Sequence, residues 1–389
     1  MRGYIRRTGK RSWQITLDTG TGPNGERRRV YETVKGGKKD AQRRLHELIV
    51  GLEKGVYAPP GRLTLAEHLR NWLAGYVKTN CQLCTQDGYQ NIVEHHLIPA
   101  LGQAQLKHLH PQAIQSYYSK AVEKLSPRTV AKHHRLLSQA LKYAVRQGYL
   151  GRNPCELVDP PSWKGKPMRT LIPAEVEALF DEAKDSYFYP VYYSAVSTGL
   201  RQGELLGLRW RDVDLDFLSI SVSQVLYKRR GICQFKEPKT AHSRRRVAMT
   251  PKLALFLREY RAERERLYRE LGKELTLDCL VFAYPDGRPL DPSVLSHEFA
   301  RLAKQAGLER VRFHDLRHTF ASLMLMRGAK PKVISEALGH ASVGFTMDVY
   351  SHIIEGMQAD AMALLDEVLP EGVVKNSVAN SSPTLDFQR

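Results

Sequence analysis

The sequence is poor in cysteine and contains no long apolar run. Its 389 residues include five cysteines, an odd number spread widely along the chain, which does not indicate a disulfide framework. No stretch of about 18 or more apolar residues occurs, so no membrane-spanning helix is predicted. The basic N-terminus is not followed by the apolar segment of a secretory signal. We expect a cytoplasmic protein with no membrane partner.

Acidic residues are also scarce relative to basic ones. The chain has 59 Lys and Arg against 41 Asp and Glu, a formal net charge of +18. A surplus of this size favours a polyanionic partner, and nucleic acid is the commonest. The alternative is that the charge only keeps the protein soluble. The length predicts two or three domains, and a hydrophobic content of 42% is enough to form their cores.

Much of the positive charge lies in residues 1–60, which carry 14 Lys and Arg against 6 Asp and Glu. Residues 3–7, 12–17 and 28–33 are short runs typical of strands, and apolar residues recur at helical spacing over 41–52. The pattern predicts a small three-stranded β-sheet backed by one helix. Such a basic sheet suits DNA binding, because the major groove admits β-ribbons as well as helices.

Residues 62–155 form a second region that is predicted to be wholly α-helical. Thr64 and Glu67 have the spacing of a capping box at the start of a helix. Ser126 followed by proline marks the start of a later helix, and Gly148 marks its end. Scattered Lys, Arg and His are expected of a helical module that grips a duplex backbone.

A cysteine pair in this region raises the question of a metal site. Cys81 and Cys84 have the spacing of a zinc-binding pair, and His95 and His96 follow. A second proper pair of ligands is missing. Val93 and Leu97, on either side of the histidines, have the spacing of core positions on a helix. We interpret the four residues as structural and expect no metal.

Residues 170–369 form the third region, predicted to be mixed α/β but mainly α. Its strand-rich middle covers residues 213–249, with a hairpin turn at 228–231. Alternating charges over 261–269 indicate a solvated helix face. The polar segment 370–389 has little periodicity and is predicted to be a flexible tail.

Four short segments of the third region carry residue types suited to phosphate chemistry. They are 198–205 with Arg201 and Glu204, then Pro238-Lys239-Thr240 followed by Arg244 to Arg246, then 314–321 with His314 and Arg317, and finally His340 ten residues before Tyr350. Breaking a phosphodiester without a metal requires fixed cations on the non-bridging oxygens. Arginine suits this task because it binds phosphate oxygens bidentately and stays protonated. A phenol has a pKa near 10, and we expect the surrounding cations to favour the phenolate.

Local sequence features suggest how these side chains are positioned. Gly199 and Gly203 flank Arg201 and permit a sharp turn into a short apolar helix over 204–208. Arg201 would then lie at a helix N-terminus, which is a natural anion site. Asp315 is expected to cap the helix of the 314–321 segment.

In order and spacing, the four segments resemble the signature regions of the tyrosine recombinases, the lambda-type phage integrase family. The resemblance covers residues 62 to about 360, and residues 1–60 resemble the arm-binding domain of many integrases. It implies a site-specific DNA recombinase in which Tyr350 cleaves DNA through a 3′-phosphotyrosyl bond. That bond keeps the energy for religation, so no ATP or other cofactor is expected. The roles implied for the remaining residues are phosphate binding by Arg201, Arg317, His314 and His340, proton donation to the 5′-oxygen by Lys239, and orientation of a catalytic group by Glu204.

Several details stay open at this point. Lys228 and Lys236 are alternatives to Lys239, and either histidine could share proton transfer with the nucleophile. The resemblance implies double-stranded DNA with core and arm sites, and a homotetramer that exchanges strands through a four-way junction, in association with the nucleoid. Whether a DNA-bending protein and an excisionase take part is left open. The amphipathic segment 357–369 fits packing on its own domain or on a neighbouring protomer.

Three rival functions are consistent with part of the pattern. A chromosome-dimer resolvase generally lacks the basic N-terminal region found in residues 1–60. A type IB topoisomerase uses related chemistry but relaxes DNA without choosing a site. A DNA-binding protein that has lost catalysis is disfavoured because all six catalytic positions are filled. The integrase of a mobile element, integrating and in some conditions excising it, is the function we expect.

Overall fold

The computed structural model describes residues 3–21, 27–53, 63–163, 168–238, 244–340, 342–344, 346–347 and 350. The chain forms two compact units, Met1–Gly165 and Lys166–Arg389, and each is described by itself. The predicted fold class is confirmed, with an N-terminal three-stranded sheet, a helical region and a mainly helical α/β region. Over the ranges named above, no helix has both the length and the apolarity needed to cross a bilayer.

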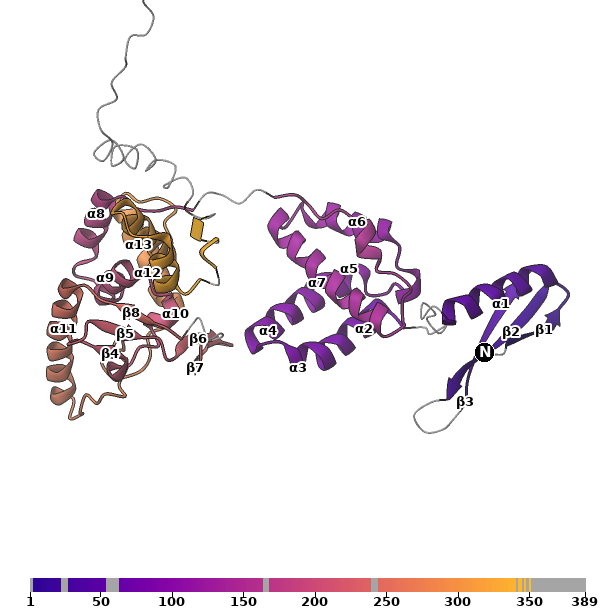
Figure 1. Ribbon diagram of the computed structural model, residues 1–389, viewed down its shortest axis with the longest axis horizontal. Helices are drawn as coiled ribbons and strands as arrows, with labels where there is room; N and C mark the ends of the chain where they lie inside the picture. Colours follow the sequence, from indigo (N-terminus) through magenta and orange to yellow (C-terminus); the bar gives the residue numbers. More distant parts are fainter. Residues whose placement is uncertain are drawn as a thin grey trace, which may run out of the picture. The chain divides into compact units, whose positions relative to one another are not determined.

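The N-terminal part of the first unit is an antiparallel sheet with the order β1-β2-β3. Its elements are β1 (Gly3–Gly9), β2 (Ser12–Thr21), β3 (Arg27–Lys35) and the helix α1 (Lys38–Glu53). Helix α1 lies along one face of the sheet (Figure 1). Ile15 and Leu17 of β2 are buried against Leu48 of α1, which gives this part a small core of its own.

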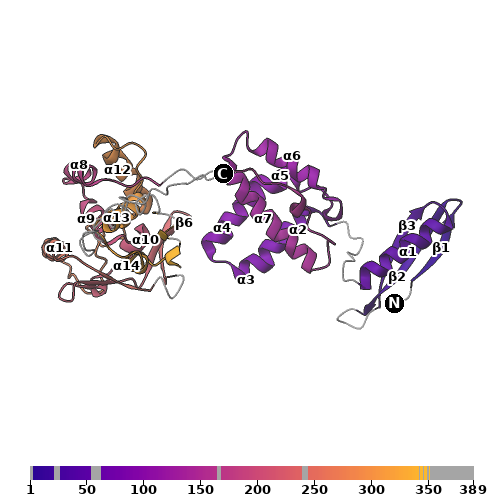
Figure 2. The same cartoon turned by 45° about the horizontal axis from the view of Figure 1, so that its top comes forward.

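The rest of the first unit is helical, as predicted. Its elements are α2 (Leu65–Trp72), η1 (Leu73–Val77), α3 (Lys78–Asn80), α4 (Leu83–Ile92), η2 (Val93–Leu97), α5 (Ile98–Leu101), η3 (Leu106–His108), α6 (Pro111–Ala121), α7 (Pro127–Arg146) and η4 (Pro154–Leu157). The helices gather around α7 in both views (Figures 1 and 2). The predicted capping box is present, because Thr64 Oγ1 accepts from the Glu67 amide at 3.2 Å and Glu67 Oε2 accepts from the Thr64 amide at 2.8 Å. Ser126 caps α7 through the Thr129 amide at 3.2 Å.

The second unit combines helices with two small antiparallel sheets, β4-β5-β8 and β6-β7. Its elements are α8 (Pro173–Ala183), α9 (Tyr189–Thr198), α10 (Gln202–Leu205), η5 (Trp210–Asp212), β4 (Val213–Asp214), β5 (Ser219–Ser221), β6 (Val225–Arg229), β7 (Ile232–Lys236), β8 (Arg246–Ala248), α11 (Pro251–Glu270), α12 (Pro292–Gln305), α13 (Asp315–Met326) and α14 (Pro331–Leu338). The hairpin turn was predicted over residues 228–231. In the structure it consists of Arg230 and Gly231, and both have a positive φ. In both views α11 lies at the edge of this unit opposite β6 (Figures 1 and 2).

Helix α13 is the most buried helix among those described in the second unit, and it determines where the candidate site forms. Residues 315–322 are all buried. Helix α9 packs along α13, and Tyr192 of α9 meets Phe313 just before α13 begins, with ring centroids 6.1 Å apart. Helix α14 also contacts α13. The ends of α9 and α14 are thereby brought to the first turn of α13, although more than 100 residues separate α9 from α13 in the sequence.

Candidate active site

The described segments that carry Arg201, Arg317 and His340 meet at the first turn of α13. Arg317 ties them together, because its Nη1 donates to the Gly199 carbonyl at 2.8 Å and its Nη2 donates to the Leu338 carbonyl at 2.6 Å. Arg201 Nη2 lies 3.4 Å from the carbonyl of Gly339 on the same side. Arg317 thus holds the ends of α9 and α14 to α13, and Arg201 links the start of α10 to the end of α14.

Arg201 lies at the start of α10 and is partly buried. Gly199 ends α9 in the left-handed conformation at φ 64°, which allows the chain to reverse. The helix that follows covers Gln202–Leu205, so the prediction of a helix over 204–208 was wrong in its bounds. With only four residues, α10 has little dipole, and any affinity for an anion comes from the guanidinium itself. The Arg201 side chain is 40% exposed and can meet a ligand from solvent.

Gly203 has a role that differs from the predicted one. A Cβ atom at this position would lie 2.4 Å from the Leu226 carbonyl oxygen and 2.9 Å from Val225 Cγ1. The missing side chain therefore lets β6 pass directly against α10. Close approach of a strand, rather than the turn, explains glycine here.

Glu204 is a buried carboxylate between two arginines. Its Oε1 accepts from Arg201 Nη1 at 2.8 Å, and its Oε2 accepts from Arg245 Nη2 at 2.9 Å. Burial alone would raise the pKa of Glu204, but the hydrogen bonds and charge of Arg245, followed by those of Arg201, lower it below its ordinary value. Arg245 is itself buried and donates through Nε to the Ala337 carbonyl at 2.6 Å. The sequence showed Arg245 only as one member of a basic run, and its pairing depends on the tertiary fold.

Arg317 is a buried cation with no carboxylate directly against it among the described residues. Burial, followed by the nearby charge of Arg201, lowers the pKa of Arg317 to about 9. The group therefore remains cationic at neutral pH. A buried guanidinium that is bonded only to carbonyl oxygens retains a strong attraction for an anion.

The two predicted site histidines occupy different positions. His314 stands at the exposed edge, and its pKa is lowered by desolvation and then by Arg317. His340 follows Gly339, which ends α14 at φ 64°, and the Nδ1 atom of His340 lies 2.8 Å from Thr346 Oγ1. Burial, followed by Arg317, lowers the pKa of His340 to about 4. Both imidazoles are consequently neutral at pH 7 in the protein alone.

Asp315 does not cap α13 in the way that was predicted. It is the first residue of the helix, and its Oδ2 accepts from the amide of Arg312 at 2.8 Å. Its Oδ1 accepts from Arg312 Nη2 at 2.8 Å. Asp315 therefore closes the turn that precedes α13, and the residue at the N-cap position is His314.

The side chain of Tyr350 is buried, with only 1% of the residue exposed. It packs with Phe320 and Leu338, and its hydroxyl lies 2.8 Å from His318 Nδ1. Burial raises the pKa of Tyr350 to about 12, although the charge of Arg317 acts to lower it. Arg317 thus favours the phenolate, as expected of a nearby cation, but desolvation of the phenolate is the larger effect in the protein without DNA. His318 was missed by the sequence analysis, although it lies one turn after His314.

The lysine predicted as a proton donor, Lys239, lies outside the described residues, as do the segments 357–369 and 370–389. The two alternative lysines both lie on the β6-β7 hairpin and have partners. The partner of Lys228 is Asp291 at the start of α12, and the partner of Lys236 is Tyr227 of β6. Lys228 Nζ lies 2.5 Å from Asp291 Oδ2, and Lys236 Nζ lies 4.8 Å from the ring centroid of Tyr227.

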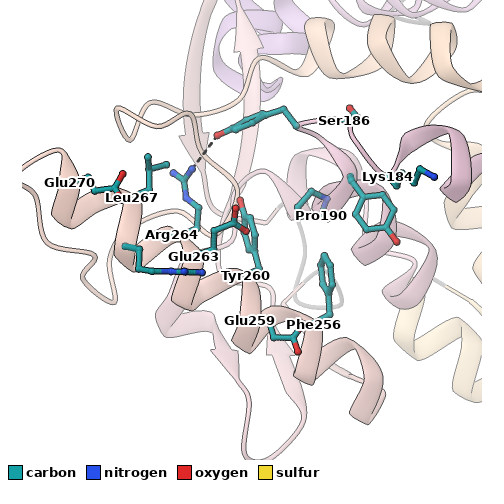
Figure 3. A pocket seen from close by; sticks show the side chains of 13 residues that line it. Lys184, Ser186, Pro190, Phe256, Glu259, Tyr260, Glu263, Arg264, Leu267 and Glu270 are labelled. Carbon is teal, nitrogen blue, oxygen red and sulfur yellow. Dashed lines mark hydrogen bonds between the residues drawn. The ribbon is translucent and has the colours of Figure 1, made fainter.

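A separate pocket of about 730 Å³ lies beside α11 and the start of α9 (Figure 3). One wall is formed by Arg264, which is 4% exposed and donates to the Tyr187 hydroxyl at 3.2 Å and to the Tyr284 carbonyl at 3.0 Å. The predicted solvated face over 261–269 was therefore wrong at Arg264, since its polar partners lie on neighbouring loops. The pocket shares no residue with the candidate active site.

The cysteine pair of the first unit has one member, Cys81, packed against the helical core. Cys81 is partly buried and Cys84 is exposed, both as free thiols. The ring of His96 packs on His133 at 4.8 Å. Across the ranges that the structure covers, no three His, Cys, Asp or Glu side chains are grouped as a metal site requires.

Comparison with known proteins places the chain among integrases. Residues 169–356 match the phage integrase family, and residues 64–122 match the SAM-like N-terminal domain of phage integrases. The chain is 27% identical to a tyrosine recombinase XerC-like protein of Caldanaerobacter subterraneus, covering 94% of this chain and 98% of that protein. It is 30% identical to the ICEBs1 integrase of Bacillus subtilis, covering 75% of this chain and 80% of that protein.

Solved structures show the same fold. The Tn1549 transposon integrase in complex with a circular intermediate DNA aligns with a TM-score of 0.68 at 21% identity, covering 79% of this chain and 100% of that chain. A lambda integrase tetramer bound to a Holliday junction aligns with a TM-score of 0.56 at 18% identity, covering 87% of this chain and 95% of that chain. The fold and the family matches define a tyrosine-type site-specific recombinase. The chain belongs to the phage integrase family.

Proposed function

We propose that this chain is the integrase of a mobile element and that it cleaves and rejoins DNA through Tyr350. The observation that carries the assignment is the convergence of Arg201, Arg317, His314 and His340 at one turn of α13, with Tyr350 packed directly beneath. These groups come from segments far apart in the sequence. The carbonyl bonds of Arg317 account for its place in the core, and a phosphate diester bound by both guanidinium groups would account for the gathering of Arg201 and Arg317 there.

Each residue has a role that follows from its position. Arg201 and Arg317 would bind the non-bridging oxygens of the scissile phosphate, since a guanidinium group matches phosphate oxygens bidentately. His314 and His340 would hydrogen-bond the same phosphate from the exposed edge. Glu204 touches Arg201 and Arg245, so it would orient the first of them and keep its charge balanced.

The reaction is a displacement at phosphorus. The phenol oxygen of Tyr350 forms a bond to phosphorus, and the bond from phosphorus to the 5′-oxygen breaks. The 5′-oxygen leaves with the electron pair of that bond and takes up a proton. We propose Lys239 as the proton donor because of its position in the sequence. The 3′-phosphotyrosyl bond that results has a free energy close to that of the bond it replaces, so a 5′-hydroxyl can reverse the step without an energy source.

A nicked suicide substrate tests the nucleophile. The expected result is a covalent adduct between the chain and a core-site duplex that carries a nick beside the scissile phosphate. Tyr350→Phe should give no adduct while binding the duplex with unchanged affinity. Tyr189→Phe, a change of the same chemistry in α9, should form the adduct at the wild-type rate. An adduct that persists in Tyr350→Phe contradicts the assignment.

The domain arrangement is proposed on the same basis. We assign residues 1–60 to arm sites, 62–155 to core sites and 170–369 to catalysis. The separate hydrophobic clusters of the N-terminal sheet and of the helical region support the first boundary. The lambda integrase neighbour is a tetramer on a Holliday junction, and we propose a homotetramer on double-stranded DNA for this chain as well. Such a protein would reside in the cytoplasm in association with the nucleoid.

A further inference from the structure

The hydrogen bond between His318 and Tyr350 joins the proposed nucleophile to a side chain with no assigned role. We propose that His318 accepts the proton of Tyr350 as the phenol oxygen attacks the phosphate. This inference rests on the proposed function, because it requires Tyr350 to be the nucleophile. It adds a proton acceptor to the candidate site, in which the proposed roles of His314 and His340 are directed to the phosphate.

The geometry is that of a nucleophile and its base. His318 Nδ1 lies 2.8 Å from the Tyr350 oxygen, within the range that permits direct proton transfer. His318 is only 8% exposed and Tyr350 only 1%, so water does not replace either partner. The charge of Arg317, the preceding residue of α13, acts on the His318 imidazole, so the acceptor lies within electrostatic reach of a proposed phosphate-binding group.

The other two histidines are placed for different tasks. His340 Nδ1 is engaged with Thr346 Oγ1 at 2.8 Å. His314 stands one helical turn before His318, with the two rings perpendicular at 5.2 Å, and it lies at the exposed edge where DNA would arrive. Among the three, His318 is the one whose nitrogen lies within hydrogen-bond distance of the phenol oxygen.

The surroundings keep His318 in the form that accepts a proton. Burial lowers the pKa of His318 to about 4, and His314 contributes the next largest effect. Arg317 and Arg312 act in the same direction, whereas Asp315 opposes them. From outside α13, Tyr350 faces the ring directly and His340 is close enough for each imidazolium to disfavour the other. We assign the Nε2-protonated tautomer to this neutral imidazole, in which Nδ1 accepts the phenol O–H.

Bound DNA strengthens this acceptor. A phosphodiester anion on Arg201 and Arg317 offsets the positive charge that disfavours the His318 imidazolium. During cleavage the O–H electron pair stays with the phenol oxygen as it bonds to phosphorus, and the proton moves to His318 Nδ1. The 5′-oxygen leaves with its own electron pair and takes a proton from the general acid. In religation the imidazolium returns its proton to Tyr350.

Two substitutions distinguish proton transfer by His318 from a purely structural contact with Tyr350. His318→Phe keeps a ring but removes the acceptor, and His318→Gln keeps an oxygen that can accept a hydrogen bond but cannot take up a proton at neutral pH. The readout is the single-turnover rate of adduct formation on the nicked core-site duplex, measured from about pH 6 to about pH 9.5, with duplex affinity measured alongside. Both variants should lose about 10²-fold or more at neutral pH without losing affinity.

The pH profile and the nucleophile's acidity supply the decisive comparison. The deficit of His318→Gln should shrink as the pH rises, because hydroxide then supplies the phenolate. A difluorotyrosine at position 350, with a more acidic phenol, should recover most of the lost rate in His318→Gln. A wild-type or faster rate in His318→Gln, or a deficit that is independent of pH and of the phenol's acidity, would overturn the inference. An adduct formed by Tyr350→Phe would overturn the nucleophile assignment first, so the two failures are distinguishable.

Discussion

At the scale of single residues, charge balance in the buried part of the site depends on Glu204. Its carboxylate contacts both Arg201 and Arg245, and the Arg245 and Glu204 side chains are 7% and 3% exposed. A buried ion pair is not always stabilising relative to an apolar pair, but removing one member leaves the other charge unpaired in a medium of low polarity. Arg317, whose charge also acts on this group, is a third cation near Glu204 and makes this loss larger.

We predict that Glu204→Gln lowers the free energy of unfolding of the second unit by about 3 kcal/mol. Adduct formation should also slow, because Arg201 loses the contact that orients it. Urea unfolding followed by tryptophan fluorescence measures the first effect, and the nicked duplex measures the second. Glu298→Gln, which breaks an exposed pair with Arg301 in α12, is the matched control and should change stability by no more than about 0.5 kcal/mol. Equal effects of the two changes would contradict the prediction.

The pH dependence of this effect has a definite sign. The folded-state pKa of Glu204 is lowered, so the unfolded chain binds more protons between the two pKa values and stability rises with pH there. The contribution of Glu204 is complete above the unfolded pKa, about 4.3, and is lost as the pH falls through the folded pKa. The difference in stability between wild type and Glu204→Gln should therefore be constant near neutrality and shrink in acid.

At the scale of elements, the contact between α10 and β6 positions Arg201. Gly203→Ala would place a Cβ atom 2.4 Å from the Leu226 carbonyl oxygen, which belongs to the backbone and cannot rotate away. We predict a loss of about 1–3 kcal/mol in stability, together with slower adduct formation as α10 is displaced. Thermal unfolding and the nicked duplex provide the measurements.

A second glycine in a helix serves as the control for this change. Gly88 lies in α4, and a Cβ atom there would meet nothing within 4 Å. Gly88→Ala should stabilise the first unit by up to about 1 kcal/mol, because alanine has the higher helix propensity. If Gly203→Ala were also neutral or stabilising, the close packing of β6 on α10 would not be what positions Arg201.

At the scale of the whole molecule, charge and modular construction govern DNA binding. The chain carries a net charge of +18, and residues 1–60 contribute +8 of it. These residues contain their own small core, in which Ile15 and Leu17 meet Leu48. A part that is stabilised in this way can be removed without opening the core of the helical region.

We predict that deleting residues 1–60 leaves adduct formation on the nicked core-site duplex within about threefold of wild type at low salt, because the proposed catalytic and core-binding parts remain. Recombination that depends on arm sites should be lost. Binding to long duplexes should become less sensitive to salt, since fewer phosphates are neutralised. Affinity titrations over a range of salt concentrations measure the slope. An unchanged slope would show that this region makes no phosphate contacts.

Local patterns in the sequence predicted the elements well where they depend on short-range physics. The capping box at Thr64 and the Ser126 cap both form as predicted. Bounds were wrong where a tertiary contact takes over, as at α10, which begins before Glu204. Asp315 was predicted to cap α13, but its carboxylate accepts from the Arg312 amide of the preceding turn, and the sequence does not show which amide it will meet.

The sequence by itself determined the fold class, the family and the order of the candidate residues, because helix caps, strand runs and motif spacing are all properties of nearby positions. Only the tertiary structure showed that Arg245 is the ion-pair partner of Glu204 and that Arg264 is buried. It also showed that the Tyr350 hydroxyl is hydrogen-bonded to His318. Burial in the tertiary structure outweighs the neighbouring charge and raises the pKa of Tyr350. Burial and pairing depend on which distant segments pack together, and no local pattern specifies that.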